Sequence, residues 1–390
     1  MGLMSEDRIA AMEGIIVRAP VTAAAAQDDN PSNEVLLIVV RTAAGLTGLG
    51  ECNHHPSAAH AFLTYQGQFR TGRGVVGALV GRDPRERDEI NAELYQANVF
   101  SARRGIGWAV LAAIDTALWD LCAQIAGVPL WHLLWGGKAQ PPIAYQTIYT
   151  GAAPWPETRR RLKKFCAAVG ELGFSAVKIE PLIDCVPEER IGEFAIEARE
   201  LLGPDIDLLI DFGYRMPTAQ RALTAIRACV PARPIAIETP CHIDAFSAWQ
   251  ATAAQSPIPI AGAELLDHPE DFQQLIDAGV QILQPWPVRV GITGSLQVIE
   301  RARRAGRRVI FAGWNATTIG LASGIHLAAG VGGSDLVLEH ASRSIYGFPL
   351  RDIANPEAQA VGGRFALPES PGLGIICDWQ AIDRLRVSAS

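Results

Sequence analysis

Three short apolar runs, each ending in an acidic residue, lie in the middle of the chain: DLLID (207–211), PIAIE (234–238) and IPIAGAE (258–264). The three acids are Asp211, Glu238 and Glu264. One acid at a strand end is common and indicates little. Three acids at successive strand ends of a parallel barrel meet on one ring, and carboxylate oxygens are the ligands that Mg²⁺ prefers. We therefore predict a metal site formed by these three residues.

Outward from these runs, strand and helix patterns alternate. Helical periodicity separates the candidate strands, for example over 188–202 and 269–278. Repeated strand–helix units of this kind predict an α/β fold of the (β/α)₈ type, which takes roughly 250 residues. The candidate strands are 142–147, 175–180, 207–212, 234–238, 258–264, 280–284, 308–312 and 335–339.

The first part of the chain has a different pattern, with strands followed by helices. Residues 13–19 and 34–42 are predicted strands, and a glycine-punctuated hairpin over 43–51 ends at Glu51. Residues 84–98 and 105–127 are predicted helices, the second of them apolar nearly all round and so buried. We predict three parts: an α+β domain (1–140), the barrel with the metal site (141–350) and a tail that returns to the first domain (351–390).

Composition excludes several classes of function. The chain has 390 residues, of which 49% are hydrophobic, and a formal net charge of −7. Without a long basic run, nucleic acid and anionic membranes are poor partners. The seven cysteines have no C-x-x-C spacing, which indicates reduced thiols rather than disulfides or a zinc site. The N-terminus lacks signal character, and Asp115 and Asp120 interrupt the apolar stretch 107–126, so a cytoplasmic protein without a membrane span is expected.

Lys178 and Glu180 stand two residues apart near the end of a predicted strand, so both side chains face the same side. A charged residue inside a barrel is costly to bury unless it is paired. Two interpretations stay open. The pair is a structural ion pair, or Lys178 is a base whose pKa is lowered by burial or raised by nearby carboxylates.

Four further segments carry a family resemblance. They are GLTGLGE (45–51), AAIDTALWDLCAQIAGVPLWHLLWGG (112–137), IPIAGAELL (258–266) and PGLG (371–374). Together they resemble the mandelate racemase/muconate lactonizing subgroup of the enolase superfamily, over nearly the whole chain.

The resemblance implies an α+β capping domain over the barrel and Mg²⁺ held by Asp211, Glu238 and Glu264. It also implies removal of a proton α to a carboxylate, giving an enediolate. That proton is very weakly acidic, and a divalent cation near the carboxylate oxygens stabilises the charge that develops. The implied partner is a small-molecule carboxylate substrate, and the resemblance implies a homo-oligomer.

This sequence departs from the subgroup at its usual bases. Where the subgroup has Lys-x-Lys, this chain has Lys178-Ile179-Glu180. Trp286 and Ala312 stand at the positions of the usual Asp–His dyad, and Gly213 replaces an asparagine. Racemisation of the mandelate type needs two bases on opposite faces of the substrate carbon, so it is disfavoured. Dehydration of a sugar acid needs only one acid/base group on one face, and we predict that reaction with Lys178 as the base.

Other predicted site residues surround this centre. Glu180, Tyr145, Tyr214 and His242 are candidate helpers in catalysis, and Glu339 at the eighth strand end is expected to hydrogen-bond substrate or an enediolate oxygen. His54 and His55, in a loop after Glu51, are candidate substrate contacts. Trp286 and Trp314 would line the barrel mouth and make it more apolar than a highly hydroxylated substrate favours.

Three alternatives remain. A one-base cycloisomerase or another lyase acting on a more apolar carboxylate would suit Trp286 and Trp314. A catalytically silent homologue that binds a carboxylate would explain the missing bases. A phosphate-binding barrel would need a Gly-rich turn, for which GVGG (330–333) is the weak candidate.

Overall fold

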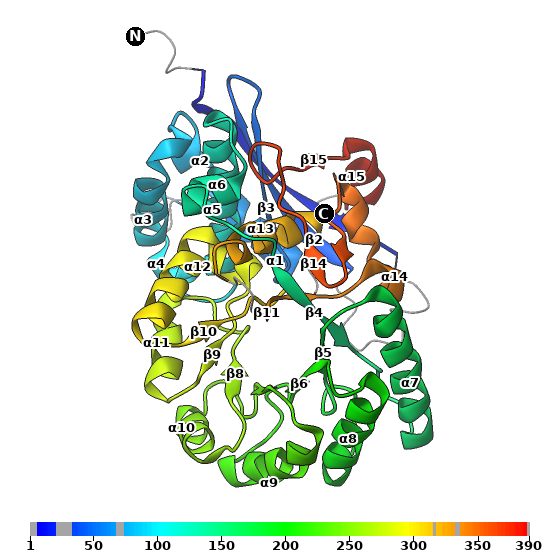
Figure 1. Cartoon of the computed structure of the whole chain (residues 1–390). Coiled ribbons are helices and arrows are strands. Elements are labelled where there is room, and N and C mark those ends of the chain that lie inside the picture. Colours follow the sequence, from blue (N-terminus) through cyan, green and yellow to red (C-terminus); the bar gives the residue numbers. More distant parts are fainter. Residues whose placement is uncertain (1–5, 21–32, 68–73, 315–316, 332–335, 388–390) are drawn as a thin grey trace.

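The computed structural model describes residues 6–20, 33–67, 74–314, 317–331 and 336–387. The chain starts with an antiparallel sheet of β1 (Ile9–Arg18), β2 (Glu34–Thr42) and β3 (Thr47–Cys52). Helices complete this N-terminal unit, and it lies beside one end of the barrel (Figure 1). They are α1 (Pro56–Thr64), α2 (Val76–Leu79), η2 (Pro84–Glu86), α3 (Arg87–Ala97), α4 (Val99–Ala102), α5 (Ile106–Ile125) and α6 (Leu130–Trp135).

Eight parallel strands form the barrel. Each pairs with the next along the chain, β10 reaches β11 through a bridge between Phe311 and Leu338, and β11 pairs with β4 to close the ring. The strands are β4 (Ile143–Ile148), β5 (Ala176–Ile179), β6 (Asp207–Asp211), β7 (Ala236–Glu238), β8 (Ile260–Gly262), β9 (Ile282–Leu283), β10 (Arg308–Val309) and β11 (Leu336–His340). The predicted (β/α)₈ fold with an N-terminal α+β unit is therefore confirmed.

Helices follow the barrel strands and surround the ring (Figure 1). They are α7 (Trp155–Leu172), α8 (Ile191–Leu202), α9 (Ala219–Cys229), α10 (Phe246–Gln255), α11 (Pro269–Asp277), α12 (Pro287–Arg304) and α13 (Thr318–Ala328), with one-turn helices η3 (Glu188–Arg190) and η4 (Val230–Ala232). Strands β9 and β10 are shorter than predicted, but their ladders continue: the Gln284 amide donates to Gly262 O (2.8 Å) and the Ile310 amide to Leu283 O (3.0 Å).

The tail lies against the N-terminal unit, where its red elements appear in Figure 1. A bridge joins Arg386 to Val17, and the Leu130 amide donates to Gly372 O at 2.8 Å. After β11 come α14 (Arg343–Tyr346) and η5 (Pro349–Ile353), and the tail continues with β12 (Ala354–Asn355), β13 (Ala360–Val361), β14 (Arg364–Phe365), β15 (Ile376–Cys377) and α15 (Trp379–Leu385). The domain limits 140 and 350 stay predictions, since β14 pairs with β4 and joins tail to barrel.

Strand β3 packs unusually close to α5 because two glycines face the helix. A Cβ on Gly48 would lie 2.3 Å from the Ala117 carbonyl oxygen, and one on Gly50 would lie 1.9 Å from that of Ala113. Helix α5 is apolar and long enough to cross a membrane, but 89% of that apolar window is buried inside the fold. The apolar character of α5 is thus explained by core packing, as predicted.

Buried carboxylates join the N-terminal unit to the barrel and the tail. Glu51, at the end of β3, accepts hydrogen bonds from the Thr317 amide (3.2 Å) and hydroxyl and from the Gly320 amide (2.9 Å), at the N-terminus of α13. Asp120 of α5 accepts from the amides of Leu49 (3.0 Å) and Leu373 (2.8 Å). These bonds fix the loop after Glu51 against the barrel.

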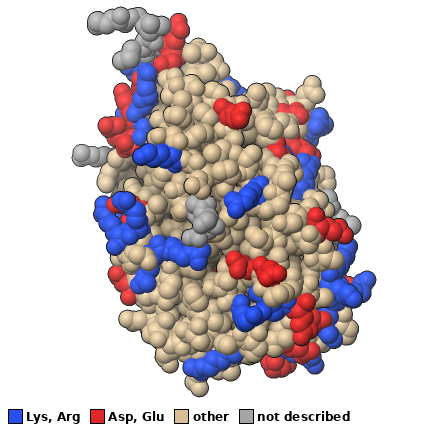
Figure 2. Space-filling model, in the orientation of Figure 1, with Lys and Arg blue, Asp and Glu red and all other residues tan. Residues whose placement is uncertain are grey.

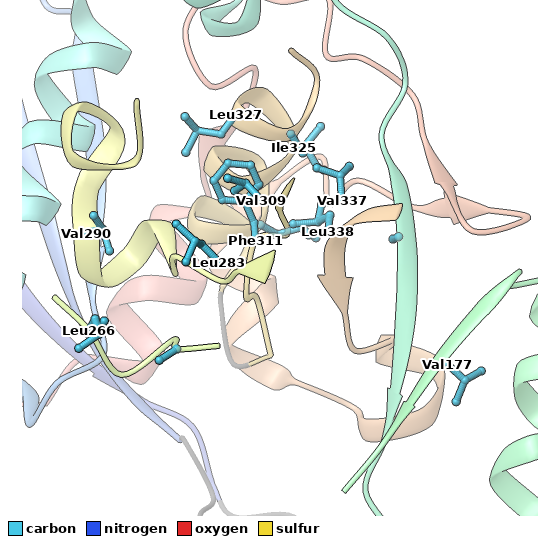
Figure 3. Packing of buried hydrophobic residues seen from close by; sticks show 14 of the residues in the cluster. Val177, Leu266, Leu283, Val290, Val309, Phe311, Ile325, Leu327, Val337 and Leu338 are labelled. Carbon is cyan, nitrogen blue, oxygen red and sulfur yellow. The ribbon is translucent and has the colours of Figure 1, made fainter. Parts of the chain in front are cut away.

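An apolar layer fills the barrel below the strand ends, with members from all eight strand regions, among them Leu209, Ala236 and Ala176. Outside the barrel, Phe311, Val337 and Leu338 pack with Ile325 and Leu327 of α13 (Figure 3). Positive and negative side chains are interspersed on the face shown in Figure 2, as the modest net charge leads one to expect.

Candidate active site

The strand ends carry charge directly above the apolar layer. Asp211 stands two residues after Leu209, and Glu238 two residues after Ala236, so each carboxylate points to the same side as the apolar residue below it. Asp211 and Glu238 are also register partners in β6 and β7. The alternation of a strand therefore places both acids inside the barrel mouth.

Lys178 lies in the middle of the carboxylates. Its Nζ is 2.9 Å from Glu238 Oε1 and 2.9 Å from Glu339 Oε1, and it is 3.5 Å from Asp211 Oδ2 and 3.6 Å from Glu180 Oε1. Burial lowers the pKa of Lys178, but the Glu238 and Glu339 carboxylates outweigh burial and leave that pKa well above its ordinary value. In this arrangement Lys178 is an ammonium ion that compensates several buried carboxylates.

Glu339, at the eighth strand end, is held as an ionised acceptor. It accepts from the Thr147 hydroxyl at 2.6 Å and from the Gly313 amide at 3.0 Å. Burial acts to raise the pKa of Glu339, but the charge of Lys178 and these hydrogen bonds bring the pKa below its ordinary value. Its predicted bond to substrate would therefore have to be one in which the substrate donates.

Asp211 and Glu264 each have a neighbour that fixes them. Asp211 Oδ1 accepts from the Gly213 amide (2.7 Å) and from the Thr239 hydroxyl. The Tyr214 hydroxyl donates to Glu264 Oε2 at 2.8 Å. Tyr214 has a φ of 61°, a left-handed conformation that is uncommon outside glycine. Both predicted ligands are thus oriented by residues near Asp211 and Glu238 in the chain.

The carboxylates have the charge and chemistry of a cation site. Burial raises the pKa of Glu238 well above its usual range, and Asp211 and Glu264 add to this effect against Lys178. Burial, followed by Asp211, raises the pKa of Glu264 to about 7. Glu238 Oε2 is buried and has no hydrogen-bond partner among the described residues. An all-oxygen set with unbalanced negative charge and an unused buried oxygen fits Mg²⁺.

The side chains of the three predicted ligands do not converge on one point in this structure. Within the described part of the chain, no three His, Cys, Asp or Glu side chains form a group ready to hold a metal ion. Lys178 occupies the space against Asp211 and Glu238, and Tyr214 holds Glu264. The three-ligand assignment therefore stays a prediction, which small side-chain movements would have to complete.

Glu180 shares with Glu238 a pKa that burial raises. Its side chain is buried, and 3.6 Å separates it from Lys178, further than Glu238 or Glu339. Burial raises the pKa of Glu180 well above its ordinary value, and the Lys178 charge does not cancel this. Tyr145 is also fully buried, with its ring centre 5.9 Å from Lys178 Nζ. Burial and the Glu339 charge raise the pKa of Tyr145 well above its ordinary value, so its hydroxyl keeps its proton.

The two tryptophans lie at separate parts of the mouth. Trp286 precedes α12, and the Arg289 guanidinium lies 5.9 Å from the centre of its ring. Trp314 belongs to an aromatic cluster with Tyr149, Tyr346 and Phe348, at ring-centre distances of 6.2, 4.8 and 5.9 Å. The Tyr346 hydroxyl donates to Thr147 O at 3.1 Å, which connects this cluster to the strand that carries Tyr145.

The predicted histidines are placed differently. His54 is half-buried, and burial together with Arg289 and His55 lowers its pKa to about 3. His55 is exposed and lies at the start of α1. His242 is exposed, and its ring contacts Asp244 at 3.8 Å. Its predicted role as a catalytic helper gains no support from these contacts.

Some site residues were missed from the sequence. Thr239 and Arg289 are examples, and the position of Thr239 directly after Glu238 is a signal that could have found it. Arg289 gave no such signal, because its hydrogen bonds go to Leu265 and Asp267, 24 and 22 residues away in the chain. The turn at 330–333, considered for phosphate, lies partly outside the described residues.

Comparison with known families agrees with this geometry. The mandelate racemase / muconate lactonizing enzyme N-terminal domain matches residues 10–135, and the enolase C-terminal domain-like family matches residues 161–381. The chain belongs to the enolase superfamily. Both matches together confirm the resemblance to its mandelate racemase/muconate lactonizing subgroup, and dehydratase and cycloisomerase relatives make this superfamily member an enzyme.

Named relatives of this superfamily member extend over most of its length. D-galactarolactone cycloisomerase of Agrobacterium fabrum is 28% identical over 374 residues, covering 90% of this chain and 91% of that one. D-galactonate dehydratase of Ralstonia nicotianae is 27% identical over 373 residues, covering 88% of each. Among solved structures, a racemase from Streptomyces coelicolor A3(2) with bound magnesium has a TM-score of 0.83 and 22% identity, over 97% of this chain and 100% of that one.

Proposed function

We propose that the protein is a Mg²⁺-dependent dehydratase of a sugar acid. The observation that carries the proposal is the placement of Lys178, whose Nζ lies 3.6 Å from Glu180 Oε1, 3.5 Å from Asp211 Oδ2 and 2.9 Å from Glu238 Oε1. Similarity to a D-galactonate dehydratase over 88% of the chain supports the same reaction. The residues that would hold Mg²⁺ are Asp211, Glu238 and Glu264.

When bound, Mg²⁺ supplies positive charge that stabilises the developing enediolate oxygens. Lys178 takes the α proton. Its ammonium is now stabilised by Glu238, Glu339 and Asp211. With Asp211 and Glu238 engaged as ligands, fewer counter-charges would hold the Lys178 proton, and its pKa would fall toward a value useful for a base.

Glu180 donates a proton to the hydroxyl group that leaves. Burial raises the pKa of Glu180, which favours the neutral carboxyl group that can donate a proton. The α C–H bond breaks toward Lys178 Nζ, the Cβ–O bond breaks, and the Glu180 proton joins the departing hydroxyl to give water. The product enol then tautomerises to a 2-keto-3-deoxy acid. Tyr145 and Glu339 stay candidate helpers in this reaction, as does His242.

The experiment for this function is substrate conversion followed by NMR. Purified protein is incubated with Mg²⁺ in D₂O with a pool of aldonic, aldaric, aromatic and dipeptide acids. Loss of one sugar acid, with a 2-keto-3-deoxy product deuterated at C3, supports a dehydratase. Exchange or conversion only outside the sugar acids contradicts the proposal, and no conversion of any acid favours a homologue that only binds carboxylates.

Replacing Glu180 with Gln separates a proton donor from a metal ligand. We expect turnover to fall about 10²- to 10⁴-fold, because glutamine keeps the shape of the side chain but cannot give up the proton. The Mg²⁺ affinity of the variant, measured by calorimetric titration, should differ from that of the wild-type protein by less than about twofold. A large loss of Mg²⁺ affinity would show that Glu180 is a ligand, and unchanged turnover would remove it from the mechanism.

Mg²⁺ affinity should depend on pH because Glu264 must lose a proton to bind a cation. Its pKa of about 7 means that the carboxyl group is increasingly protonated below pH 7. We expect affinity to be nearly constant above pH 8 and to fall by up to about tenfold per pH unit below pH 7. Titrations at pH 8, 7 and 6 check this, and equal affinity at all three would contradict it.

A second candidate function is a cycloisomerase. A D-galactarolactone cycloisomerase matches 90% of this chain, and Trp286 and the Trp314 cluster give the mouth apolar surface. With sugar-acid lactones added to the pool, the NMR experiment separates the two functions, because a cycloisomerase would consume a lactone without loss of water. We also propose that the protein works in the cytoplasm, because all seven cysteines are free thiols. We further propose that it forms a homo-oligomer, as its subgroup suggests.

A further inference from the structure

Three buried nitrogen atoms beside the barrel mouth have no hydrogen-bond partner among the described residues. They are His54 Nε2, Trp286 Nε1 and Arg289 Nε. Buried polar atoms in native proteins are nearly always paired, so several in one region point to a missing partner. His54 comes from the N-terminal unit, whereas Trp286 and Arg289 flank the start of α12.

These residues belong to one region next to a predicted ligand. Arg289 lies 5.9 Å from the centre of the Trp286 ring, and its Nη1 donates to the Leu265 carbonyl, one residue after Glu264, at 3.1 Å. The Arg289 charge also acts on His54. The region is therefore at the side of the mouth where the loop after β8 and the loop after Glu51 meet.

His54 offers an acceptor. Its Nδ1 lies 3.1 Å from Asn53 Oδ1, so Nδ1 carries the hydrogen and donates to that oxygen. The other nitrogen, Nε2, then has a lone pair. Because the ring is neutral at physiological pH, Nε2 pairs with a group that brings its own hydrogen.

Trp286 and Arg289 offer hydrogen-bond donors, and the positive charge of Arg289 is already balanced by a carboxylate. Trp286 Nε1 and Arg289 Nε are N–H groups. The Arg289 Nη1 donates to Asp267 Oδ1 at 2.9 Å, so the guanidinium has a carboxylate partner. A carboxylate of a ligand placed here would lie near the Asp267 carboxylate as well as near Arg289. It would also face the lone pair of His54 Nε2.

We propose that this region binds a neutral hydroxyl group of the substrate, donating to His54 Nε2 and accepting from Trp286 Nε1 or Arg289 Nε. The substrate would then be a sugar acid with one carboxylate and a hydroxylated far end, an aldonic rather than an aldaric acid. This inference rests on the proposed dehydratase function. A carboxylate at the same place has no hydrogen to donate, so it leaves the acceptor His54 Nε2 unpaired. A site that binds substrate by hydrogen bonds discriminates strongly against a ligand that leaves one of its buried polar groups unpaired.

The test compares two classes of acid. Conversion of D-gluconate and D-galactonate is measured beside D-glucarate and galactarate with the Mg²⁺-loaded enzyme. We expect kcat/KM to be at least 100-fold higher for whichever aldonate is converted. A preference for either aldarate overturns the inference and keeps the dehydratase. Conversion of neither class is a failure of the proposed function, and the inference falls with it.

Variants of His54 test the polarity of the contact. His54→Leu removes the acceptor and should lower kcat/KM for the aldonate 10- to 100-fold, mainly through KM. His54→Gln keeps an acceptor oxygen and should restore most of this loss. His54→Lys supplies a cation and should reduce the ratio of kcat/KM for the aldonate to kcat/KM for the aldarate at least tenfold. His132→Gln, an exposed histidine away from this region, is the matched control. Equal kinetics of His54→Leu and His132→Gln would overturn the proposed contact.

Discussion

Replacing Lys178 with Met should lower turnover by about 10³-fold or more, with the Mg²⁺-loaded protein still folded. Methionine keeps the length and burial of the side chain but cannot accept a proton, and positioned acid–base groups contribute on the order of 10²–10⁴ in rate. Lys178 is also the cation that Glu238 and Glu339 contact at 2.9 Å, so its loss removes charge compensation from both. The two effects act in the same direction on catalysis.

The measurement is the single-turnover rate at saturating Mg²⁺ with the substrate identified by NMR. Lys164→Met, on the exposed face of α7, is the matched control and should retain the wild-type rate. Circular dichroism in Mg²⁺ checks that the variant is folded. Should Lys178→Met turn over within twofold of wild type, Lys178 is not the base and the mechanism has to be rebuilt around another group.

Replacing Gly50 with Ala should destabilise the protein by about 3 kcal/mol or more. The added Cβ would lie 1.9 Å from the carbonyl oxygen of Ala113, an atom of the helix backbone that cannot rotate away. Inserting a single methyl group into a well-packed core typically costs about 1–3 kcal/mol, and a contact with backbone is at the upper end of that range or beyond it.

Urea unfolding monitored by tryptophan fluorescence measures the difference. Gly77→Ala is the control, since a Cβ at Gly77 meets no atom within 4 Å and that glycine lies in helix α2. It should be neutral or slightly stabilising. A Gly50→Ala variant as stable as Gly77→Ala would mean that β3 can move away from α5 without cost, contrary to the packing described above.

The sequence was sufficient for the parts of the fold that depend on local pattern. Strand alternation placed Asp211 above Leu209 and Glu238 above Ala236, so two predicted ligands came from spacing alone. Glu264 does not fit the same spacing, because it stands three residues after Ala261. The alternation is interrupted at Gly262, whose φ of 156° is rare for other residues. Glu264 was predicted from its place at the end of the third apolar run, and the resemblance of IPIAGAELL (258–266) supported it.

Features that depend on contacts between distant segments could not be predicted. The sequence showed Lys178 and Glu180 on one face but did not show that Glu238 and Glu339 lie closer to Lys178 than Glu180 does. Nor did it show that burial raises the pKa of both Glu180 and Glu238, whereas Lys178 and hydrogen bonds bring the pKa of Glu339 below its ordinary value. Nor did the sequence show that the ring of His242, four residues after the predicted ligand Glu238, is exposed to solvent, and its role as a helper stays a prediction.

The bonds of Glu51 have a consequence for how substrate preference can change. The carboxylate holds three donors at the start of α13, and α1 begins at Pro56, so the segment 53–55 is anchored at both ends. Those three positions, which include His54, can be exchanged by mutation or by grafting from a relative while the anchors stay in place. New selectivity could therefore evolve here at little risk to folding, provided that Glu51 is retained.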